Sequence, residues 1–251
     1  MRHTPVTPNG DRLCWVELPG ADPARVYVHG LGASAPAYFA AVAAHPVLSG
    51  RRSLLADLLG FGLSDRPTDF PYTMEAHADA LAVALRAAGV AGAEVIGHSM
   101  GGTVAVHLAA RHPDLVSALV LVDANLDPVV PSRRSGSSGI ATFTEEEFLN
   151  GGRREVRESV SPFWWATMRL AGPEALHRSA VHLARGSVRE LLLDLPLPRT
   201  FLHPAADGEP AGAARLRSAG VQVTAVPDCG HNIMIDNPEG FVRAVAGALA
   251  R

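Results

Sequence analysis

Residues 93–110 read A-E-V-I-G-H-S-M-G-G-T-V-A-V-H-L-A-A, and this stretch decides the fold. The apolar pair Val95 and Ile96 runs directly into a glycine-flanked serine, Ser99, and a helix-forming segment that contains Val104 follows without a linker. The pattern predicts a strand, a very tight turn and a helix, with Ser99 at the bend. In a G-x-S-x-G turn of this kind the serine backbone is strained and its hydroxyl projects beyond the sheet.

The two glycines beside Ser99 have a steric explanation. A side chain at Gly97 or Gly101 would collide across so sharp a bend. The helix that starts here also points its free N–H groups and positive dipole end at the serine, where a developing oxyanion would be stabilised. Ser99 is therefore a candidate nucleophile. The five-residue string is common by itself, so the prediction depends on finding chemical partners elsewhere in the chain.

The composition indicates a globular chain with a large core. The chain has 251 residues, of which 47% are hydrophobic and 19% charged. A formal net charge of -3 and a pI of 6.4 give no electrostatic reason to expect nucleic acid or an anionic membrane as a partner. No apolar run approaches the ~20 residues that span a bilayer. Residues 1–12 lack the apolar centre of a signal peptide, so a cytoplasmic location is expected.

Neither a metal nor a cofactor is expected. Cys14 and Cys229 are too few for a disulfide scaffold, and Cys229 is interpreted as an unreactive buried thiol. The eleven histidines are scattered, without an H-E-x-x-H pattern or a paired cysteine motif. No G-x-G-x-x-G opens a helix after the first strand, which argues against a nucleotide cofactor.

Strands and helices alternate along most of the chain. This order predicts an α/β fold with a mainly parallel, doubly wound sheet and helices on both sides. Strands are predicted at 12–18, 25–28, 53–56, 95–96, 118–122, 199–203 and 221–226, and helices at 35–44, 73–88, 210–219 and after Asn237.

The middle of the chain departs from this alternation. Residues 127–195 contain no convincing strand, but a Ser/Arg/Gly-rich loop at 132–139 and helix starts at Thr144, Ser161 and Ser187. An insertion of this length between core strands is typical of a functional lid. The predicted domains are therefore a core of residues 1–126 and 196–251 and a helical cap of residues 127–195.

Ser99, Asp207 and His231 each directly follow the carboxyl end of a predicted strand. In open parallel sheets the ligand site lies outside these strand ends, so the three loops are expected to converge. A serine hydroxyl needs a base within hydrogen-bond reach, and histidine suits that role because its unperturbed pKa is about 6.5. A carboxylate holds the imidazole in the correct tautomer. The order Ser, Asp, His is the order of an α/β-hydrolase triad.

Nearly the whole chain resembles the α/β-hydrolase superfamily. The matching pieces are the turn His29-Gly30-Leu31-Gly32, the loop 57–67, the elbow 97–102, Asp207 and the pair Gly230-His231. The resemblance implies that Ser99 is the nucleophile, His231 the general base and Asp207 the acid that orients the imidazole. It also implies that the N–H groups of Leu31 and Met100 form an oxyanion hole and that the helical insertion is a cap over the pocket.

The acid of the triad has a competitor. Members of the superfamily often carry glycine three residues before the acid, where this chain has Pro204. Asp123, at the end of the preceding strand, is the alternative. Asp207 is favoured, because an aspartate at the Asp123 position is frequent even in members that do not use it. Asp57, Asp65 and Asp228 are interpreted as loop-stabilising groups.

The predicted reaction is acyl transfer to water. Ser99 stands where epoxide hydrolases and haloalkane dehalogenases carry aspartate, which disfavours their alkyl-enzyme chemistry. The leading hypothesis is a carboxylic-ester hydrolase for a small hydrophobic substrate, with a thioesterase, lactonase, C–C bond hydrolase or cofactor-free haloperoxidase as alternatives. A ligand-binding sensor with a hydrolase-like pocket is the non-enzyme alternative, and the oligomeric state is left open. Candidate pocket residues are His29, His98, Phe163, Trp164, Trp165 and Met168.

Overall fold

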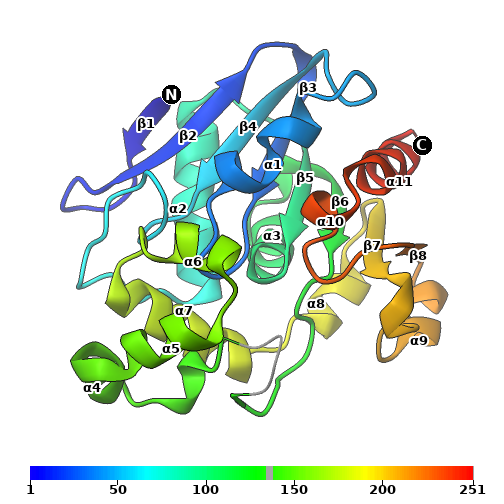
Figure 1. Cartoon of the computed structure of the whole chain (residues 1–251). Helices are drawn as coiled ribbons and strands as arrows, with labels where there is room; N and C mark the ends of the chain where they lie inside the picture. The colour runs from blue at the N-terminus through cyan, green and yellow to red at the C-terminus, as the bar shows by residue number, and fades with distance from the viewer. Residues whose placement is uncertain (134–137, 251) are drawn as a thin grey trace.

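The computed structural model of the protein describes residues 1–133 and 138–250. Its strands form one sheet with the order β1-β2-β4-β3-β5-β6-β7-β8 (Figure 1). The pairs β1/β2 and β2/β4 are antiparallel, and every later pair is parallel. The strands are β1 (Arg2–Pro5), β2 (Arg12–Leu18), β3 (Ala21–Val28), β4 (Arg51–Asp57), β5 (Ala93–His98), β6 (Val116–Val122), β7 (Arg199–Pro204) and β8 (Val221–Val226).

Helices cover both faces of this sheet, so the predicted α/β class is confirmed. α1 and α11 pack on one face, and α2 and α3 pack on the other (Figure 1). The helices outside residues 127–195 are α1 (Ala35–Ala43), α2 (Met74–Ala87), α3 (Met100–Arg111), α9 (Ala213–Ser218), α10 (Ile233–Asp236) and α11 (Pro238–Leu249), with the short 3₁₀ turns η1 (Pro113–Leu115) and η4 (Ala205–Asp207).

Local capping groups set several predicted helix boundaries. Thr73 Oγ1 accepts a hydrogen bond from the Ala76 N–H at 3.1 Å at the start of α2. Gly89, just beyond the end of α2, has a φ of 68°, which glycine adopts without steric cost. Asn237 caps α11 by accepting from the Gly240 N–H at 2.8 Å. These boundaries agree with the sequence prediction because each one depends on neighbouring residues alone.

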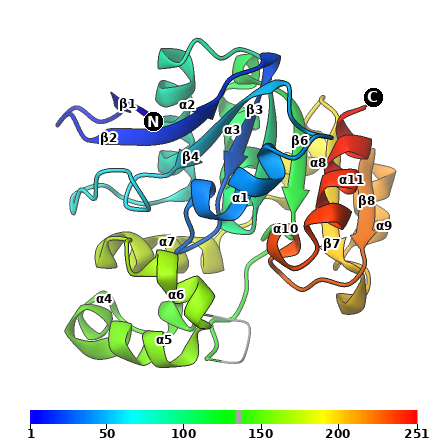
Figure 2. The same ribbon diagram turned by 45° about the horizontal axis from the view of Figure 1, so that its top comes forward.

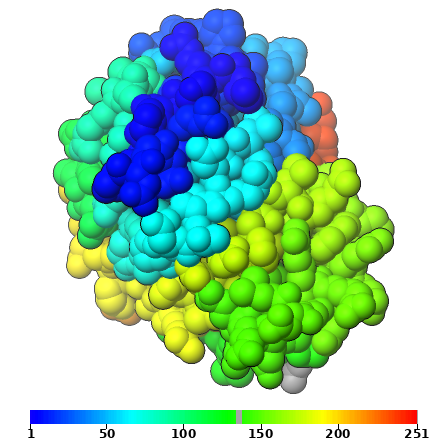
Figure 3. All heavy atoms as spheres, turned by 90° about the vertical axis from the view of Figure 1, so that its left-hand side faces the viewer, coloured from blue at the N-terminus to red at the C-terminus, as the bar shows by residue number. Residues whose placement is uncertain are grey.

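The described part of residues 127–195 is helical and contains no strand. It lies between β6 and β7 in the chain and forms a lobe beyond the strand ends (Figure 2), packed against the core in the space-filling view (Figure 3). Its elements are η2 (Ile140–Thr142), α4 (Glu145–Glu147), η3 (Phe148–Gly152), α5 (Arg153–Ser159), α6 (Pro162–Met168), α7 (Pro173–Arg185) and α8 (Arg189–Asp194).

The helix starts predicted in this lobe are mostly confirmed. Thr144 forms a capping box with Glu147, and Ser161 caps α6. The helix predicted after Ser187 is present as α8, but the capping box predicted there is wrong: α8 has no side-chain cap, and the Ser187 hydroxyl donates to the Leu126 carbonyl at 3.4 Å. Of the predicted loop at 132–139, positions 134–137 lie outside the described residues.

Other elements also differ from the sequence prediction. β1 was not predicted, since it is a four-residue edge strand that contains a proline and pairs only with β2. α9 is shorter than the predicted helix at 210–219. Within residues 1–133 and 138–250, none of the helices combines the length and apolar character needed to cross a membrane.

Candidate active site

Ser99 stands at the turn between β5 and α3, as the sequence predicts. Its backbone is in an unusual conformation, with φ of 51° and ψ of -121°. Its N–H donates to the Val122 carbonyl of β6 at 2.9 Å. A Cβ on Gly97 would lie 2.5 Å from the Gly101 carbonyl oxygen, and one on Gly101 would lie 2.4 Å from the Val28 carbonyl oxygen. The steric explanation for both glycines is therefore confirmed.

His231 follows β8 and is hydrogen-bonded to Asp123. The Nδ1 of His231 lies 2.6 Å from Asp123 Oδ2, so the Nδ1–H donates to this carboxylate. The two side chains are 49% and 27% exposed. Asp123 comes directly after β6, has a φ of 44°, and its N–H donates to the Leu202 carbonyl of β7 at 2.8 Å. The Nδ1 proton is thereby fixed, which leaves Nε2 as the proton acceptor.

This contact corrects the expectation for Asp207. β7 continues to Pro204, and the single turn η4 then carries Asp207 to an exposed position. Within the described ranges, the Asp207 side chain makes no hydrogen bond to His231 or to any other group. The prediction that Asp207 is the partner of His231 is wrong. Asp123 takes that place because it begins its loop at the strand end itself.

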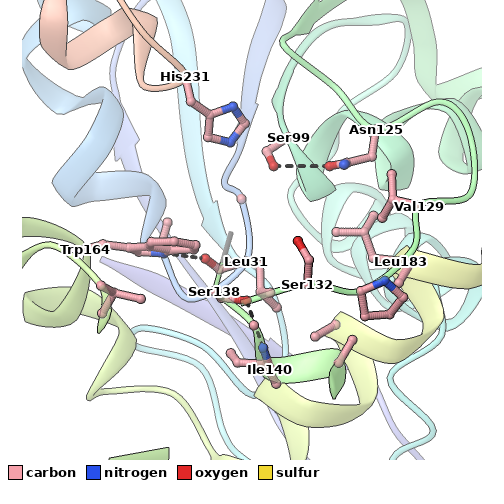
Figure 4. A pocket seen from close by; sticks show the side chains of 18 of the residues that line it. Leu31, Ser99, Asn125, Val129, Ser132, Ser138, Ile140, Trp164, Leu183 and His231 are labelled. Carbon is pink, nitrogen blue, oxygen red and sulfur yellow. Dashed lines mark hydrogen bonds between the residues drawn. The ribbon is translucent and has the colours of Figure 1, made fainter. Parts of the chain in front are cut away.

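Ser99 and His231 both face one cavity at the carboxyl ends of the strands (Figure 4). The Ser99 hydroxyl donates to Asn125 Oδ1 at 3.2 Å. Among the residues that the structure describes, no hydrogen bond joins Ser99 to His231. Sequence reasoning did not single out Asn125; its position two residues after Asp123 at a strand end was the signal available.

The glycine turn after β3 lies beside the serine. A Cβ on Gly30 would lie 3.0 Å from His98 Nδ1 and 3.2 Å from the Ser99 Cβ, so a larger residue would require these side chains to shift by a few tenths of an ångström. Leu31 lines the cavity. Met100 is the first residue of α3, where helix geometry leaves the N–H without an intrahelical partner. The roles expected of the Leu31 and Met100 N–H groups remain a prediction.

Two histidines close to the serine are held in neutral form. His29 is fully buried; its Nδ1 donates to the Gly30 carbonyl at 2.7 Å, and its Nε2 accepts from the Leu58 N–H at 3.1 Å. His98 Nε2 donates to the His231 carbonyl at 3.0 Å. Burial, and then the neighbouring His231 ring, lower the pKa of His98 well below its ordinary value. His98 therefore holds the His231 loop as an uncharged ring.

The cavity has a volume of about 700 Å³, within the range of small-molecule sites. The described residues that line it include no Asp, Glu, Lys or Arg. Of the candidate pocket residues, His98 and Trp164 line the cavity, whereas His29, Phe163, Trp165 and Met168 do not. All the described residues that line the cavity, candidates or not, include Gly30, Leu31, Tyr38, His98, Ser99, Asn125, Val129, Ile140, Val160, Trp164, Leu183 and His231.

The two tryptophans of the helical lobe, Trp164 and Trp165, have different surroundings. The indole N–H of Trp164 donates to the Leu31 carbonyl at 2.8 Å, which ties α6 to the glycine turn (Figure 4). Trp165 lies instead in a separate groove, with the Arg153 guanidinium 5.9 Å from its ring. Adjacent helical residues diverge by about 100°, so only one of the pair can face the cavity.

The other two candidates in the helical lobe, Phe163 and Met168, pack against residues that line the cavity or lie beside it. Phe163 is 43% exposed and packs on Tyr38, with the ring centres 5.2 Å apart. Met168 is fully buried against the glycine turn. Across the described residues, no group of three or more His, Cys, Asp or Glu side chains is arranged to hold a metal ion.

A family model matches part of this chain, and several known proteins are similar to it. Residues 25–143 match the family described as alpha/beta hydrolase fold. The lipase LipV of Mycobacterium tuberculosis is 52% identical over 67 residues, which span 27% of this chain and only 25% of that protein. A 2-hydroxymuconate semialdehyde hydrolase of Pseudomonas putida is 27% identical over 242 residues, which cover 89% of this chain and 85% of the relative.

A solved structure extends the similarity to the entire fold. A thermophilic esterase from Thermogutta terrifontis, solved with bound malate, superposes with a TM-score of 0.75 at 24% identity. The match covers 100% of this chain and 98% of the esterase. At this level of identity the similarity concerns the fold, including the helical lobe between β6 and β7.

Proposed function

We propose that this chain, whose residues 25–143 match the family described as alpha/beta hydrolase fold, is a serine hydrolase that cleaves carboxylic esters of small, uncharged, hydrophobic molecules. The observation that carries this proposal is the 2.6 Å hydrogen bond from His231 to Asp123 on the wall of a cavity that also contains Ser99. Relatives include a protein named as a lipase and others named as hydrolases or esterases.

The proposed triad is Ser99, His231 and Asp123. Ser99 Oγ attacks the ester carbonyl carbon, and its proton passes to Nε2 of His231 as the Oγ–C bond forms. Asp123 stabilises the resulting imidazolium through the Nδ1–H. The proton then goes to the leaving alcohol, and an acyl group remains on Ser99. Water, deprotonated by His231, releases the acid in a second round of the same steps.

The backbone N–H groups of Leu31 and Met100 form the proposed oxyanion hole. One lies in the glycine turn after β3, which approaches Ser99 at Gly30, and the other lies at the start of α3, directly after Ser99. Preorganised donors of this kind stabilise charge that develops in the transition state. The hydrogen bond from Trp164 to the Leu31 carbonyl holds the next peptide of the same glycine turn, between Leu31 and Gly32. Residues 127–195 thus act as a cap that forms a wall of the pocket and supports its oxyanion turn.

The cavity favours an uncharged ester over the substrate of the C–C bond hydrolases. A muconate semialdehyde carries a carboxylate, and a buried carboxylate needs a cationic partner. The described lining residues provide no arginine or lysine. Many of them are aliphatic, which suits a hydrocarbon acyl chain, and the others include serine hydroxyls, two imidazoles, two amides, one phenol and one indole, all uncharged polar or aromatic groups.

The direct test is turnover of p-nitrophenyl esters by the wild type and by Ser99→Ala. We expect multiple turnovers in the wild type and a loss of at least about 10⁴-fold in kcat in the variant. One equivalent of nitrophenol without further release would instead support a binding protein. Equal turnover by the variant would remove Ser99 from the mechanism.

The cap tryptophans offer a test of the acyl site with a built-in control. Trp164→Ala removes an indole from the cavity wall and so enlarges the cavity. It should change the ratio of kcat/KM for nitrophenyl octanoate to kcat/KM for nitrophenyl acetate by about tenfold. Trp165→Ala, outside the cavity, should keep the wild-type ratio. A shift in the second variant alone would place the acyl chain elsewhere.

A further inference from the structure

We infer that Asn125 is a positioning residue that holds the Ser99 hydroxyl away from His231 until a substrate enters the cavity. The inference rests on the proposed function, because it describes the resting state of the same serine. Its starting point is the hydrogen bond in Figure 4, where Ser99 Oγ donates to Asn125 Oδ1 at 3.2 Å. In the described ranges this bond takes the place of one between Ser99 and His231.

The position of Asn125 is fixed by the helix that Ser99 begins. Thr103, on the first turn of α3, donates its hydroxyl to the Asn125 carbonyl at 2.7 Å. Ala124 packs over Gly102, where an added Cβ would lie 2.4 Å from the Ala124 Cβ. The loop is therefore seated directly on α3, and its amide has a defined place relative to the serine.

The bond to Asn125 keeps the serine unactivated. An amide oxygen accepts a hydrogen bond but does not take up a proton near neutral pH, whereas a neutral imidazole does. Attack requires Ser99 Oγ to turn about χ1 so that its proton faces Nε2 of His231. Leaving Asn125 therefore precedes the chemical step.

A ligand can cause this change because Asn125 lines the cavity. A substrate N–H or O–H donor can take over the amide oxygen. Asn125 then keeps a partner when the serine turns to His231, so the serine leaves at little net cost in hydrogen bonds. The same short loop thus acts on both reacting groups: Asp123 orients His231, and Asn125 restrains Ser99.

The test measures how fast a small p-nitrophenyl phosphonate ester modifies the empty enzyme. Modification forms the Oγ–P bond, transfers the Oγ proton to His231 and expels nitrophenolate. Asn125→Leu, of similar size but without an acceptor, should react about two- to tenfold faster, the factor that corresponds to one neutral hydrogen bond. Asn125→Asp offers a stronger, charged acceptor and should react more slowly than the wild type.

The matched control is Asn150→Leu, the same substitution at an exposed position of the cap outside the cavity. It should react at the wild-type rate. An unchanged or slower rate in Asn125→Leu would overturn the inference, because the amide would then have no effect or would assist the serine. Should that variant not fold by circular dichroism, Asn125→Ala carries the same expectation.

Failure of the proposed function gives a different result. In that case the wild type would not react, or Ser99→Ala would be modified equally fast. If the wild type reacts through Ser99 and the Asn125 variants do not differ from it, only the restraint by Asn125 is disproved.

Discussion

Two neighbouring strands of the sheet, β6 and β7, are each followed by an aspartate, and the two carboxylates have different surroundings. Asp123 directly follows β6, with a strained φ of 44° and its side chain on His231. Asp207 follows β7 by one helical turn and is exposed. β6 and β7 are parallel and paired, so their ends lie at the same edge of the sheet. The distance of the aspartate from its strand end, rather than the choice of strand alone, decides which one reaches the histidine.

The strain at Asp123 supports this conclusion. A non-glycine residue at positive φ costs free energy and persists where the surrounding structure requires it. Ser99 has a comparable φ of 51° at the end of the adjacent β5. Each residue donates its N–H to the next strand: Ser99 to Val122, and Asp123 to Leu202. Two strained residues, anchored in the same way on neighbouring strands, place the Asp123 carboxylate on the His231 ring and the Ser99 hydroxyl in the cavity that this ring also lines.

The largest expected effect comes from removing the charge of each aspartate in turn. Asp123→Asn should lower kcat for a nitrophenyl ester by about 10³- to 10⁴-fold, because the amide no longer stabilises the correct tautomer or the imidazolium. Asp207→Asn should keep kcat within about twofold of the wild type. The reverse pattern would assign the acid to the loop after β7.

A smaller effect is expected from moving the loops without changing either acid. In Gly102→Ala the new Cβ meets Ala124, so it pushes the Asp123 loop and should lower kcat by about 10- to 100-fold. The counterpart in the loop after β7 is Gly208→Ala. Its new Cβ would have no other atom within 4 Å, but the φ of 74° at this position strains the backbone of an alanine.

The Gly208→Ala variant should lower the free energy of unfolding by about 1–3 kcal/mol and retain kcat. Thermal unfolding followed by circular dichroism separates the two effects. Loss of kcat in Gly208→Ala with a normal Gly102→Ala would show that the loop after β7, not the one after β6, supports the reaction.

The parts of the site that were predicted from the sequence depend on local sterics. The turn at Ser99 requires glycine at positions 97 and 101, because any side chain there would collide with backbone atoms. The tight turn can therefore be predicted from the glycines alone. His231 was found because it follows the last strand of the core. The alternation of strands and helices also gave the fold class, since it needs no knowledge of distant contacts.

The parts that were not predicted depend on tertiary contacts. The choice between Asp123 and Asp207 is decided by where each strand stops relative to His231, which the sequence does not contain. Pro204, in place of the glycine often found three residues before the acid, was the one local sign against Asp207. Which of Trp164 and Trp165 lines the cavity depends on how the helical lobe packs on the core. The contact of Asn125 with Ser99 likewise depends on how the loop after β6 packs on α3.

The most direct test of the central claim is proton NMR of the His231 ring in ¹⁵N-histidine-labelled protein. An Nδ1–H that is hydrogen-bonded to a carboxylate resonates far downfield of the amides, and its absence from His231→Gln assigns it. We expect this resonance in the wild type and in Asp207→Asn, and its loss or strong upfield shift in Asp123→Asn. A resonance that survives Asp123→Asn and disappears in Asp207→Asn would contradict the account.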